Sequence, residues 1–539
     1  MTHGQQSTAA ARRARRILDA LAIAIFLALI AAPTVDAWVR PAASRSPLRH
    51  ELRTPAPKPE RPRSVAEFTA LPAACDAYFK DSFGLRDKLL RWDHIVKVFG
   101  FGISPSADVI LGDNDFVFYA GELSRENHRG ALPFTPAELA RWGDVLEAKR
   151  AVLDALGVRY LYVIAPDKET VYADWLPASM EPIGPTRKAQ WLAFMKEHHP
   201  RVEVLDLTEA LVAARADDAP DDWVYGNLGT HWSGRGSLVA LKALSTRLDD
   251  LVGGFEPALL DDFRRVPSDM GGDSWASRMY LGDLLRQVDT AMVPAQPRAR
   301  ATVQGELHFG RVRTSVIEGS SRPRLFLMHD SFGPYVELGL AEQCSFLEAR
   351  WALSVDAAEV AAARPAALVD LRVERTFNTL PPEELALTED AAWGERFRAS
   401  DCILLAADKT RDDWGIAPLG AAKLGPAVAT PKPRLPVSVE NIAARLGFPI
   451  LTPIAGETPV LHLSIESSCA TDLVLFHREP GADRDDPHCA YRRRLREGAN
   501  EFFVPLDRLD APGELRLRPG DPACTFQLRE FEVRSVRRP

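Results

Sequence analysis

Closely spaced cysteines are missing from this chain. No C-x-x-C pair occurs in its 539 residues, and no Cys/His cluster has the spacing of zinc ligands; the six cysteines are scattered, at Cys75, Cys344, Cys402, Cys469, Cys489 and Cys524. Structural zinc sites need ligands at short, regular spacing. The sequence therefore predicts no metal site, and it contains no motif that indicates a cofactor.

An excess of positive charge is missing as well. Lys and Arg number 66 against 74 Asp and Glu, which gives a net charge of −8. Because the arginines are interleaved with acidic residues, no basic face suited to a phosphate backbone is expected. The sequence therefore argues against nucleic acid as a partner.

Length and apolar content indicate several packed domains. A single hydrophobic core stops growing at roughly 250–300 residues, so 539 residues with 46% hydrophobic content predict two or three domains. Proline-rich stretches that read as linkers lie near residues 39–72 and 429–436. The expected division is a signal peptide or signal anchor over 1–37, a linker over 38–72, a first domain over 73–428 and a second over 437–539.

The N-terminus has the order of an export signal. Four arginines within residues 12–16 precede an apolar run over 20–32, as in signal peptides and signal anchors. Val35-Asp36-Ala37 resembles a small-residue cleavage site, yet the apolar stretch extended to Val35 is long enough to anchor. Signal cleavage and an inner-membrane anchor both remain open, and either predicts a periplasmic protein.

Strands and helices alternate through the middle of the chain. Thr135-Pro136-Ala137-Glu138 is a capping box with proline at the first helical position, and Gly157 ends the helix that it starts. Two short helices are expected within 76–98 and a hairpin at 109–119. Further strands and helices then alternate at 160–164, 187–198, 202–205, after Trp232, at 325–328, after Gly333 and at 366–369. This order predicts an α/β domain with a parallel sheet flanked by helices.

One strand of this series ends at a serine. Leu325-Phe326-Leu327-Met328 reads as a buried strand, and His329-Asp330-Ser331-Phe332-Gly333 follows it. In a layered α/β domain, the turn between a strand end and a helix start exposes side chains beside free backbone N–H groups. Ser331 is therefore a candidate nucleophile, although Asp330 and Ser331 could equally serve as caps of the next helix.

A histidine lies on an earlier loop. Residues 223–233 are rich in turn formers and lead into a helix that Ser233 could cap, with His231 near its start. A serine nucleophile needs a base within hydrogen-bond reach, and imidazole titrates in the useful range. His231 is thus a candidate base, and the alternative is a histidine that merely packs beside Trp232.

The order of these motifs resembles a known family. Besides Asp330-Ser331-Phe332-Gly333 and Thr230-His231-Trp232, the segments 78–86 (Tyr-Phe-Lys-Asp-Ser-Phe-Gly-Leu-Arg), 166–172 (Pro-Asp-Lys-Glu-Thr-Val-Tyr) and 373–375 (Val-Glu-Arg) look like the SGNH-hydrolase-like family of the alginate O-acetyltransferases AlgJ and AlgX. The resemblance covers roughly residues 76–381. It implies an SGNH-like fold in which Ser331 is the nucleophile and His231 the base.

The chain departs from this family at two positions. The family usually has Asp two residues before the histidine, and Gly229 stands there. A third triad member orients the imidazole and stabilises its charge, so Asp221, Asp222 or Asn227 on the same loop would have to replace it. The second departure is His329, which is either structural or an additional titrating group.

A second serine matches the SGNH nucleophile block better by letters alone. Gly271-Gly272-Asp273-Ser274 contains Gly-Asp-Ser. Residues 266–270 before it are turn-like rather than strand-like, so Ser274 lacks a sheet edge from which to project. Ser331 remains the preferred nucleophile.

The last third of the chain predicts a smaller all-β domain. Short strand-like runs are separated by turn residues, at 461–465, 473–476, 502–506, 515–517 and 526–533. Such spacing indicates a β-sandwich. By the resemblance this domain would bind carbohydrate, although Tyr491 is its only Tyr or Trp; the alternative is an inert packing domain. In an oxidising compartment Cys469 could pair with Cys489 or Cys524.

Taken with the resemblance, these features predict an exported O-acetyltransferase, or an acetylesterase, that acts on hydroxyls of a surface or extracellular polysaccharide through an acetyl-Ser331 intermediate. The acetyl donor would be delivered by a membrane acyltransferase partner. A catalytically weak or inactive protein that binds polysaccharide or scaffolds an export and modification complex is the alternative, and a cell-wall hydrolase of the same fold also remains open.

Overall fold

The computed structural model describes most of the chain, namely residues 3–39, 56–267, 274–286, 290–304, 311–352, 357–379, 387–411, 413–420, 422–428, 433–440, 444–478, 486–506, 509, 512–520, 522 and 524–537. Its internal contacts divide the chain into two compact units. The first comprises Met1–Ser106 with Ser274–Arg286, and the second comprises Ala107–Asp273 with Gln287–Pro539.

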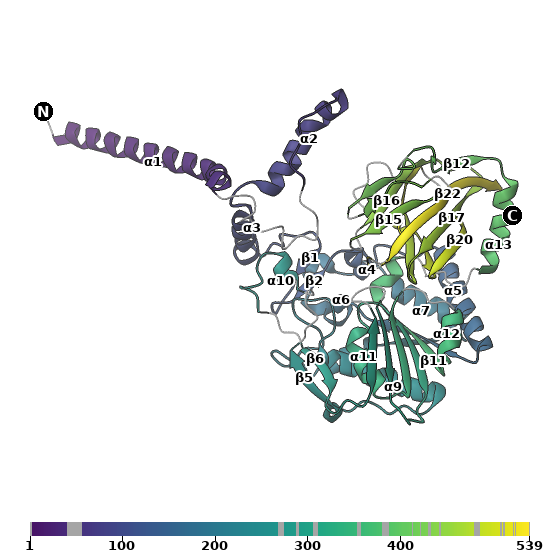
Figure 1. Cartoon of the computed structure of the whole chain (residues 1–539). Helices are drawn as coiled ribbons and strands as arrows, with labels where there is room; N and C mark the ends of the chain where they lie inside the picture. The colour runs from purple at the N-terminus through teal and green to yellow at the C-terminus, as the bar shows by residue number, and fades with distance from the viewer. Residues whose placement is uncertain are drawn as a thin grey trace. The chain divides into compact units, whose positions relative to one another are not determined.

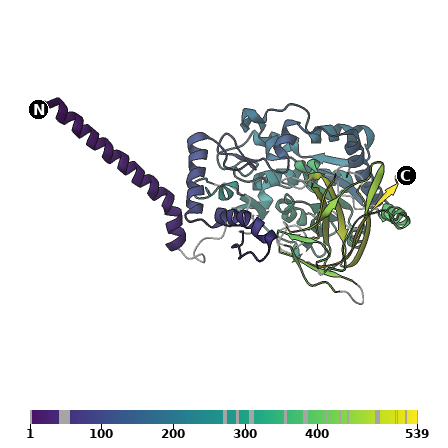
Figure 2. The same ribbon diagram turned by 90° about the horizontal axis from the view of Figure 1, so that it is seen from above.

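The first unit begins with one continuous helix, α1 (His3–Val39) (Figure 2). Within it, Arg15–Asp36 is a 22-residue stretch of mean hydropathy 2.3. A membrane span needs about 20 apolar residues, so this stretch is long and apolar enough to cross a membrane. That test by length and composition is equally met by a signal sequence.

Helix α2 (Val65–Ser82) corrects the expected extent of the linker. It starts before residue 72, the predicted linker end, and carries Pro72 inside it. Ser64 explains the early start, because its side chain accepts a hydrogen bond from Glu67 N at 3.2 Å. This N-cap, three residues before a glutamate, is a helix start that proline density concealed.

Residues 274–286 pack with the first unit. Helix α3 (Arg86–Ile95) continues as a short π-helix, η2 (Val96–Gly100), and its Arg91 forms an ion pair with Asp283. Ser274 is the residue before the four-residue helix α10 (Trp275–Arg278). The competing serine therefore lies in the first unit, whereas Ser331 and His231 lie in the second.

The second unit contains a seven-stranded sheet (Figure 1). Its strands lie in the order β4 (Glu203–Asp206), β3 (Arg159–Ala165), β11 (Ala367–Val373), β9 (Arg324–His329), β10 (Phe346–Trp351), β8 (Val312–Val316) and β7 (Arg300–Gln304). The first five are parallel, and β8 and β7 pair antiparallel. The predicted α/β class is confirmed, but the sheet is mixed because two antiparallel strands extend one edge.

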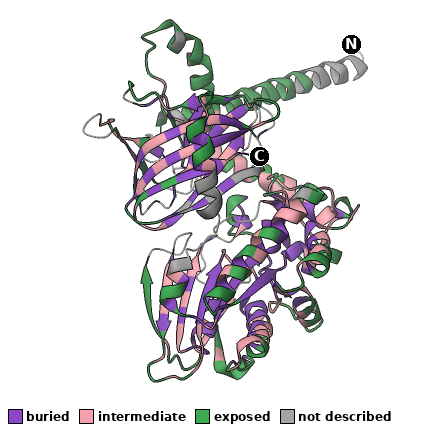
Figure 3. Ribbon diagram, turned by 90° about the vertical axis from the view of Figure 1, so that its right-hand side faces the viewer, coloured by how far each residue is buried: buried purple, intermediate pink, exposed green. Residues whose placement is uncertain are grey.

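Helices cover both faces of this sheet. Leu161 and Leu325 share a core with α9 (Gly234–Val252) and α11 (Pro334–Ala341). Their strand neighbours Tyr160 and Phe326 belong to another core with α5 (Pro136–Ala155) and α7 (Arg187–His198). Alternate residues of a strand point to opposite faces, so continuous apolar strands such as β9 are buried on both sides (Figure 3).

Several predicted local signals are confirmed. The capping box of Thr135 and Glu138 starts α5, and β1 (Val109–Leu111) pairs with β2 (Val117–Tyr119) as the expected hairpin. Ser233 caps α9, since its Oγ accepts a hydrogen bond from Gly236 N at 3.3 Å. This cap fixes where the loop that carries His231 ends.

The predicted β-sandwich is also confirmed. One antiparallel sheet has the order β14 (Ala422–Leu424), β15 (Leu435–Val439), β22 (Thr525–Arg537), β17 (Glu457–Ser467) and β20 (Gly498–Pro505), with β12 (Ile403–Ala406) on β22. The other has the order β13 (Ala417–Leu419), β16 (Arg445–Leu451), β21 (Gly513–Arg518), β18 (Thr471–Arg478) and β19 (Asp486–Leu495). Phe448 and Phe531 stack between the sheets with ring centroids 3.5 Å apart.

The sandwich sheets begin earlier than the sequence suggested. Strands β12, β13 and β14 lie within the expected first domain, yet each pairs with a strand of the sandwich. Pro436, expected in a linker, lies inside β15, and its carbonyl oxygen accepts a hydrogen bond from Gly425 N at 2.9 Å. The density of prolines therefore led to a wrong boundary between the two domains. A proline can lie in a strand where only its carbonyl oxygen is used for pairing, because no N–H is needed at that position.

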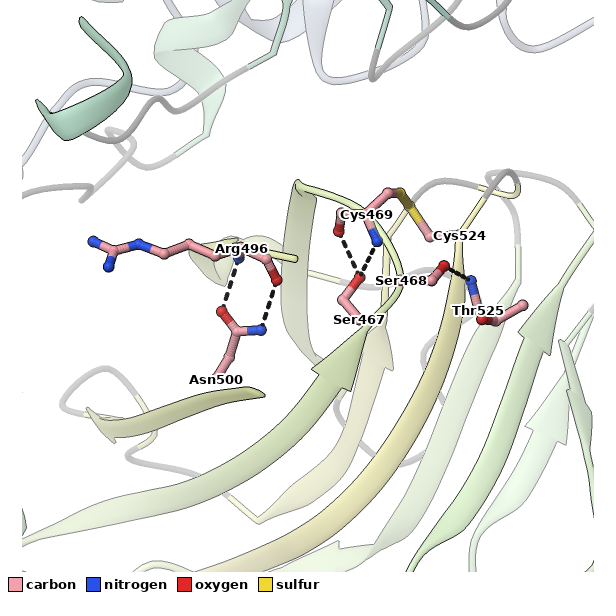
Figure 4. Close-up of a disulfide and its surroundings, with 7 residues drawn as sticks. All are labelled: Ser467, Ser468, Cys469, Arg496, Asn500, Cys524 and Thr525. Carbon is pink, nitrogen blue, oxygen red and sulfur yellow. Dashed lines mark hydrogen bonds between the residues drawn. A yellow bond between two sulfur atoms is a disulfide. The ribbon is translucent and has the colours of Figure 1, made fainter. Parts of the chain in front are cut away.

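A disulfide joins Cys469 to Cys524, one of the two pairings left open by the sequence (Figure 4). It links the turn after β17 to the residue before β22. Ser468 lies beside it, and its Oγ accepts a hydrogen bond from Thr525 N at 2.8 Å. The covalent link thus closes one end of the sandwich.

Candidate active site

The five parallel strands of the sheet end at one edge, and chemically active side chains follow three of them. Asp167 and Lys168 come after β3, Ser331 after β9, and Arg375 after β11. The carboxyl edge of a parallel sheet is where α/β folds bind ligands, because helix N-termini and loops converge there. These side chains therefore share the edge at which a catalytic site is expected.

Ser331 lies in a turn that hydrogen bonds hold in shape. Asp330 Oδ1 accepts from Phe332 N at 2.9 Å, and its Oδ2 accepts from Val373 N at 2.6 Å. The carbonyl oxygen of Asp330 accepts from Gly333 N at 3.2 Å. Two N–H groups after Ser331, expected to stabilise an oxyanion, are thus engaged inside the turn. Asp330 ties the turn to β11 and does not merely cap α11.

His231 lies on a loop folded back on itself. Tyr225 and Trp232 form an antiparallel bridge, and Gly226 N donates to the carbonyl oxygen of His231 at 3.2 Å. Ser233 N donates to the carbonyl oxygen of Val224 at 3.0 Å. These backbone hydrogen bonds therefore fix the position of His231 in the loop immediately before α9.

The fold brings the two sequence-predicted residues into one region. The imidazole of His231 lies 4.8 Å from the ring of Phe332 and 5.5 Å from that of Tyr335, with the second pair stacked at 26°. Phe332 is the residue directly after Ser331, and Tyr335 is in the first turn of α11. His231 and Ser331 are both partly buried. The imidazole of His231 therefore lies beside the turn that carries Ser331.

Lys168 binds the backbone of the loop that carries His231. Its buried Nζ donates to the carbonyl oxygens of Gly226, Asn227 and Gly229, at 2.8, 2.9 and 2.7 Å. The ammonium also lies 4.9 Å from the ring centroid of Phe116, a cation–π contact. One buried cation therefore fixes the path of the loop two residues before His231.

The proposed replacements for the missing acid differ in their surroundings. Asp222 Oδ1 accepts a hydrogen bond from Arg265 at 2.7 Å, which commits one carboxylate oxygen to a partner other than His231. Asp221 has a left-handed backbone, with φ of 66°. Asn227 is buried, and its carbonyl oxygen accepts from Val117 N at 2.8 Å as well as from Lys168. Asn227 is thus the most firmly placed of the three.

A buried charge cluster adjoins the Ser331 turn. Arg375 forms ion pairs with Asp167 and Glu122, and its guanidinium lies 5.8 Å from the ring centroid of Phe332. Asp167 N donates to Glu374 Oε2 at 3.1 Å. Burial and the nearby carboxylates raise the pKa of Asp167 to about 8, against the opposing charge of Arg375. The cluster links the ends of β3 and β11 beside the nucleophile turn.

Reasoning from the sequence missed the roles of Lys168 and Asp167. Both occur in a segment that resembles the family, and both directly follow a buried strand, which is a signal that could have identified them. Among the residues that the structure describes, no group of three or more His, Cys, Asp or Glu side chains could hold a metal ion.

Comparisons with known proteins found one matching family model and several similar solved structures. Residues 109–332 match the family model described as SGNH hydrolase-like domain, acetyltransferase AlgX. Solved structures that resemble the chain include Bacillus cereus PatB1 with a sulfonyl adduct (10% identity, 50% of this chain and 97% of that one, TM-score 0.38), the O-acetyltransferase domain of Pseudomonas putida AlgJ (18%, 54% and 98%, 0.35) and Pseudomonas aeruginosa AlgX (14%, 79% and 94%, 0.37). No curated protein matches the chain.

Proposed function

We propose that this chain, whose residues 109–332 form an SGNH hydrolase-like domain of the AlgX acetyltransferase family, is an O-acetyltransferase that modifies hydroxyls of a surface or extracellular polysaccharide of the alginate type. Ser331 is the nucleophile in this proposal and His231 is the base. An acetylesterase shares the first half of the reaction, with water in place of the sugar hydroxyl in the second half.

The reaction has two acyl transfers. Ser331 Oγ attacks the acetyl carbonyl of the donor while His231 takes the hydroxyl proton, and the leaving group departs with that proton. A sugar hydroxyl then attacks acetyl-Ser331, and His231 takes the new proton and returns it to Ser331 Oγ. The acetyl group has moved to the polysaccharide and the enzyme is restored.

One observation carries the proposal. The imidazole of His231 packs against Phe332 and Tyr335, which follow Ser331 by one and four residues. A general base must lie within reach of the nucleophile, and these ring contacts support that role for His231. The family model ends at residue 332 and so spans both His231 and Ser331.

The proposal extends to the compartment and to two partners. Helix α1 would act as a cleaved signal or as an inner-membrane anchor, which supports a periplasmic location. An integral membrane acyltransferase would supply the acetyl group, because acetyl donors are made in the cytoplasm. The β-sandwich would hold the polysaccharide near the site.

A chromogenic acetyl ester tests the chemistry directly. Purified protein should release the chromophore and become acetylated at Ser331, and Ser331→Ala should abolish both. Phe332→Leu, which keeps an apolar neighbour of the turn, should retain labelling and serves as a folded control. Equal rates in wild type and Ser331→Ala would contradict the role of Ser331 as the nucleophile.

A second function rests on Gly229. Without an acid to orient and stabilise His231, turnover falls by about 10⁴ in enzymes that depend on one, and Asp222 is engaged by Arg265. The chain would then be a catalytically weak protein that binds polysaccharide or scaffolds a modification complex. This function predicts polysaccharide binding that survives both Ser331→Ala and His231→Ala, without covalent labelling of Ser331 by a serine-directed phosphonate.

A further inference from the structure

A second histidine lies beneath the nucleophile turn. His329 is the last residue of β9, and its side chain is fully buried. Its Nδ1 lies 2.6 Å from the carbonyl oxygen of Asp330, and its Nε2 lies 2.9 Å from Glu337 Oε1 on α11. Both ring nitrogens therefore face hydrogen-bond acceptors.

Glu337 is an anion at this position. Both of its carboxylate oxygens accept from Arg311, at 3.0 and 2.9 Å, and its side chain is buried with that of His329. Burial opposes ionisation of Glu337, but the hydrogen bond and charge of His329 and the charges of Arg311 and Arg313 outweigh it and lower the pKa of Glu337. The imidazole of His329 thus lies between the Asp330 carbonyl oxygen at Nδ1 and the Glu337 carboxylate at Nε2.

The contacts of His329 act on the turn that carries Ser331. The carbonyl oxygen of Asp330 accepts from His329 Nδ1 and from Gly333 N, so the two donors fix the peptide immediately before Ser331. The ring fills the space beside Gly333, where an added Cβ would lie 2.0 Å from His329 Cγ. The charged groups that face the ring are Glu337, Arg311, Arg313 and Asp330. Three elements thus converge on one ring below Ser331.

We propose that His329 is a positioning residue for Ser331, and this role rests on the proposed function of Ser331. Its Nδ1 lies against the Asp330 carbonyl oxygen, and the pair of Glu337 and Arg311 holds the ring in place. Loss of the Nδ1 contact frees the peptide immediately before Ser331, so the turn is held less firmly and acylation slows.

Two substitutions test the two ring nitrogens of His329 separately. His329→Asn places an amide N–H near the position of Nδ1 and can still donate to Asp330, whereas His329→Gln places its amide near Nε2 and can still donate to Glu337. We expect His329→Asn to keep most of the acylation rate. His329→Gln should lower kcat at least tenfold with KM changed less than twofold.

The measurement is the rate of Ser331 labelling by a serine-directed phosphonate, together with steady-state ester hydrolysis, from pH 6 to pH 10. His462→Gln is the matched control, since His462 forms a similar pair with Glu501 in the sandwich and should leave both readouts unchanged. Equal losses in His329→Asn and His329→Gln, or wild-type profiles in both, would overturn the role of His329. Absence of labelling in the wild type would instead overturn the proposed function, and this role with it.

Glu337→Gln keeps the test decisive if the His329 variants do not fold. It preserves the shape of Glu337 but removes the charge that pairs with Arg311 beside the His329 ring, so the ring is held less firmly and kcat should fall while KM changes less than twofold. A wild-type kcat in folded Glu337→Gln contradicts the proposal.

Discussion

Lys168 Nζ lies 2.7 Å from the carbonyl oxygen of Gly229, the residue at which the resemblance to the acetyltransferase family led us to expect an acid. The same ammonium binds two further carbonyls of that loop, so the backbone before His231 is fixed even though the expected acidic side chain is missing. Lys168 therefore fixes the backbone of the loop, whereas the residue at position 229 determines whether the loop carries an acid. A substitution can change either property without the other.

Replacement of Lys168 should unfold the histidine loop. Lys168→Met keeps much of the side-chain volume but removes the donor to the carbonyl oxygens of Gly226 and Gly229, whereas the Asn227 carbonyl keeps its hydrogen bond from Val117 N. Each buried group left unsatisfied costs about 1–3 kcal/mol, so we expect a loss of at least ~2 kcal/mol in the free energy of unfolding. Urea denaturation followed by tryptophan fluorescence measures it.

Lys409→Met is the control for that change. Lys409 pairs with Glu530 at the surface of the sandwich, and such pairs contribute about 0–1 kcal/mol. If Lys168→Met were no less stable than Lys409→Met, the three carbonyl contacts would not be what holds the loop.

Gly229→Asp restores the acid at the family position. Gly229 lies outside the left-handed backbone region, so an L-amino acid can adopt its conformation. If the lack of charge limits the enzyme, ester hydrolysis should rise at least ~10-fold, since loss of the corresponding acid costs on the order of 10⁴ elsewhere. Gly229→Asn tests orientation without charge, and it should raise the rate less. A rate unchanged in folded Gly229→Asp would mean that another group already serves His231.

Local signals predicted much of the fold. The capping box at Thr135 and the apolar run of β9 are written in consecutive residues, and so are the strand-end serine and the loop histidine. Their meeting at one edge followed from the parallel order of the strands, because parallel strands share their carboxyl edge. The sequence thus predicted two residues that the fold brings into one region.

What the sequence could not supply depends on partners far apart in the chain. Arg375 binds Asp167, and β12 joins the sandwich through β22, each across more than a hundred residues. A lysine that binds carbonyl oxygens has no partner side chain to be found by pattern, which is why Lys168 escaped notice. The prolines at 429–436 indicated a linker, although Pro436 lies in β15. The sequence alone does not reveal that this strand pairs through the carbonyl oxygen of Pro436.

The raised pKa of Asp167 makes stability depend on pH. Its pKa is about 8 in the folded chain, raised chiefly by burial, against about 3.9 when unfolded. The folded state therefore binds a proton more readily, so this group stabilises the fold at low pH and the contribution is lost as pH rises from about 4 through 8. We expect the free energy of unfolding to decline over this range more steeply in the wild type than in Asp167→Asn, while the exposed change Asp113→Asn leaves the slope unaltered. Parallel profiles for wild type and Asp167→Asn, from urea titrations at each pH, would show that Arg375 keeps Asp167 ionised throughout.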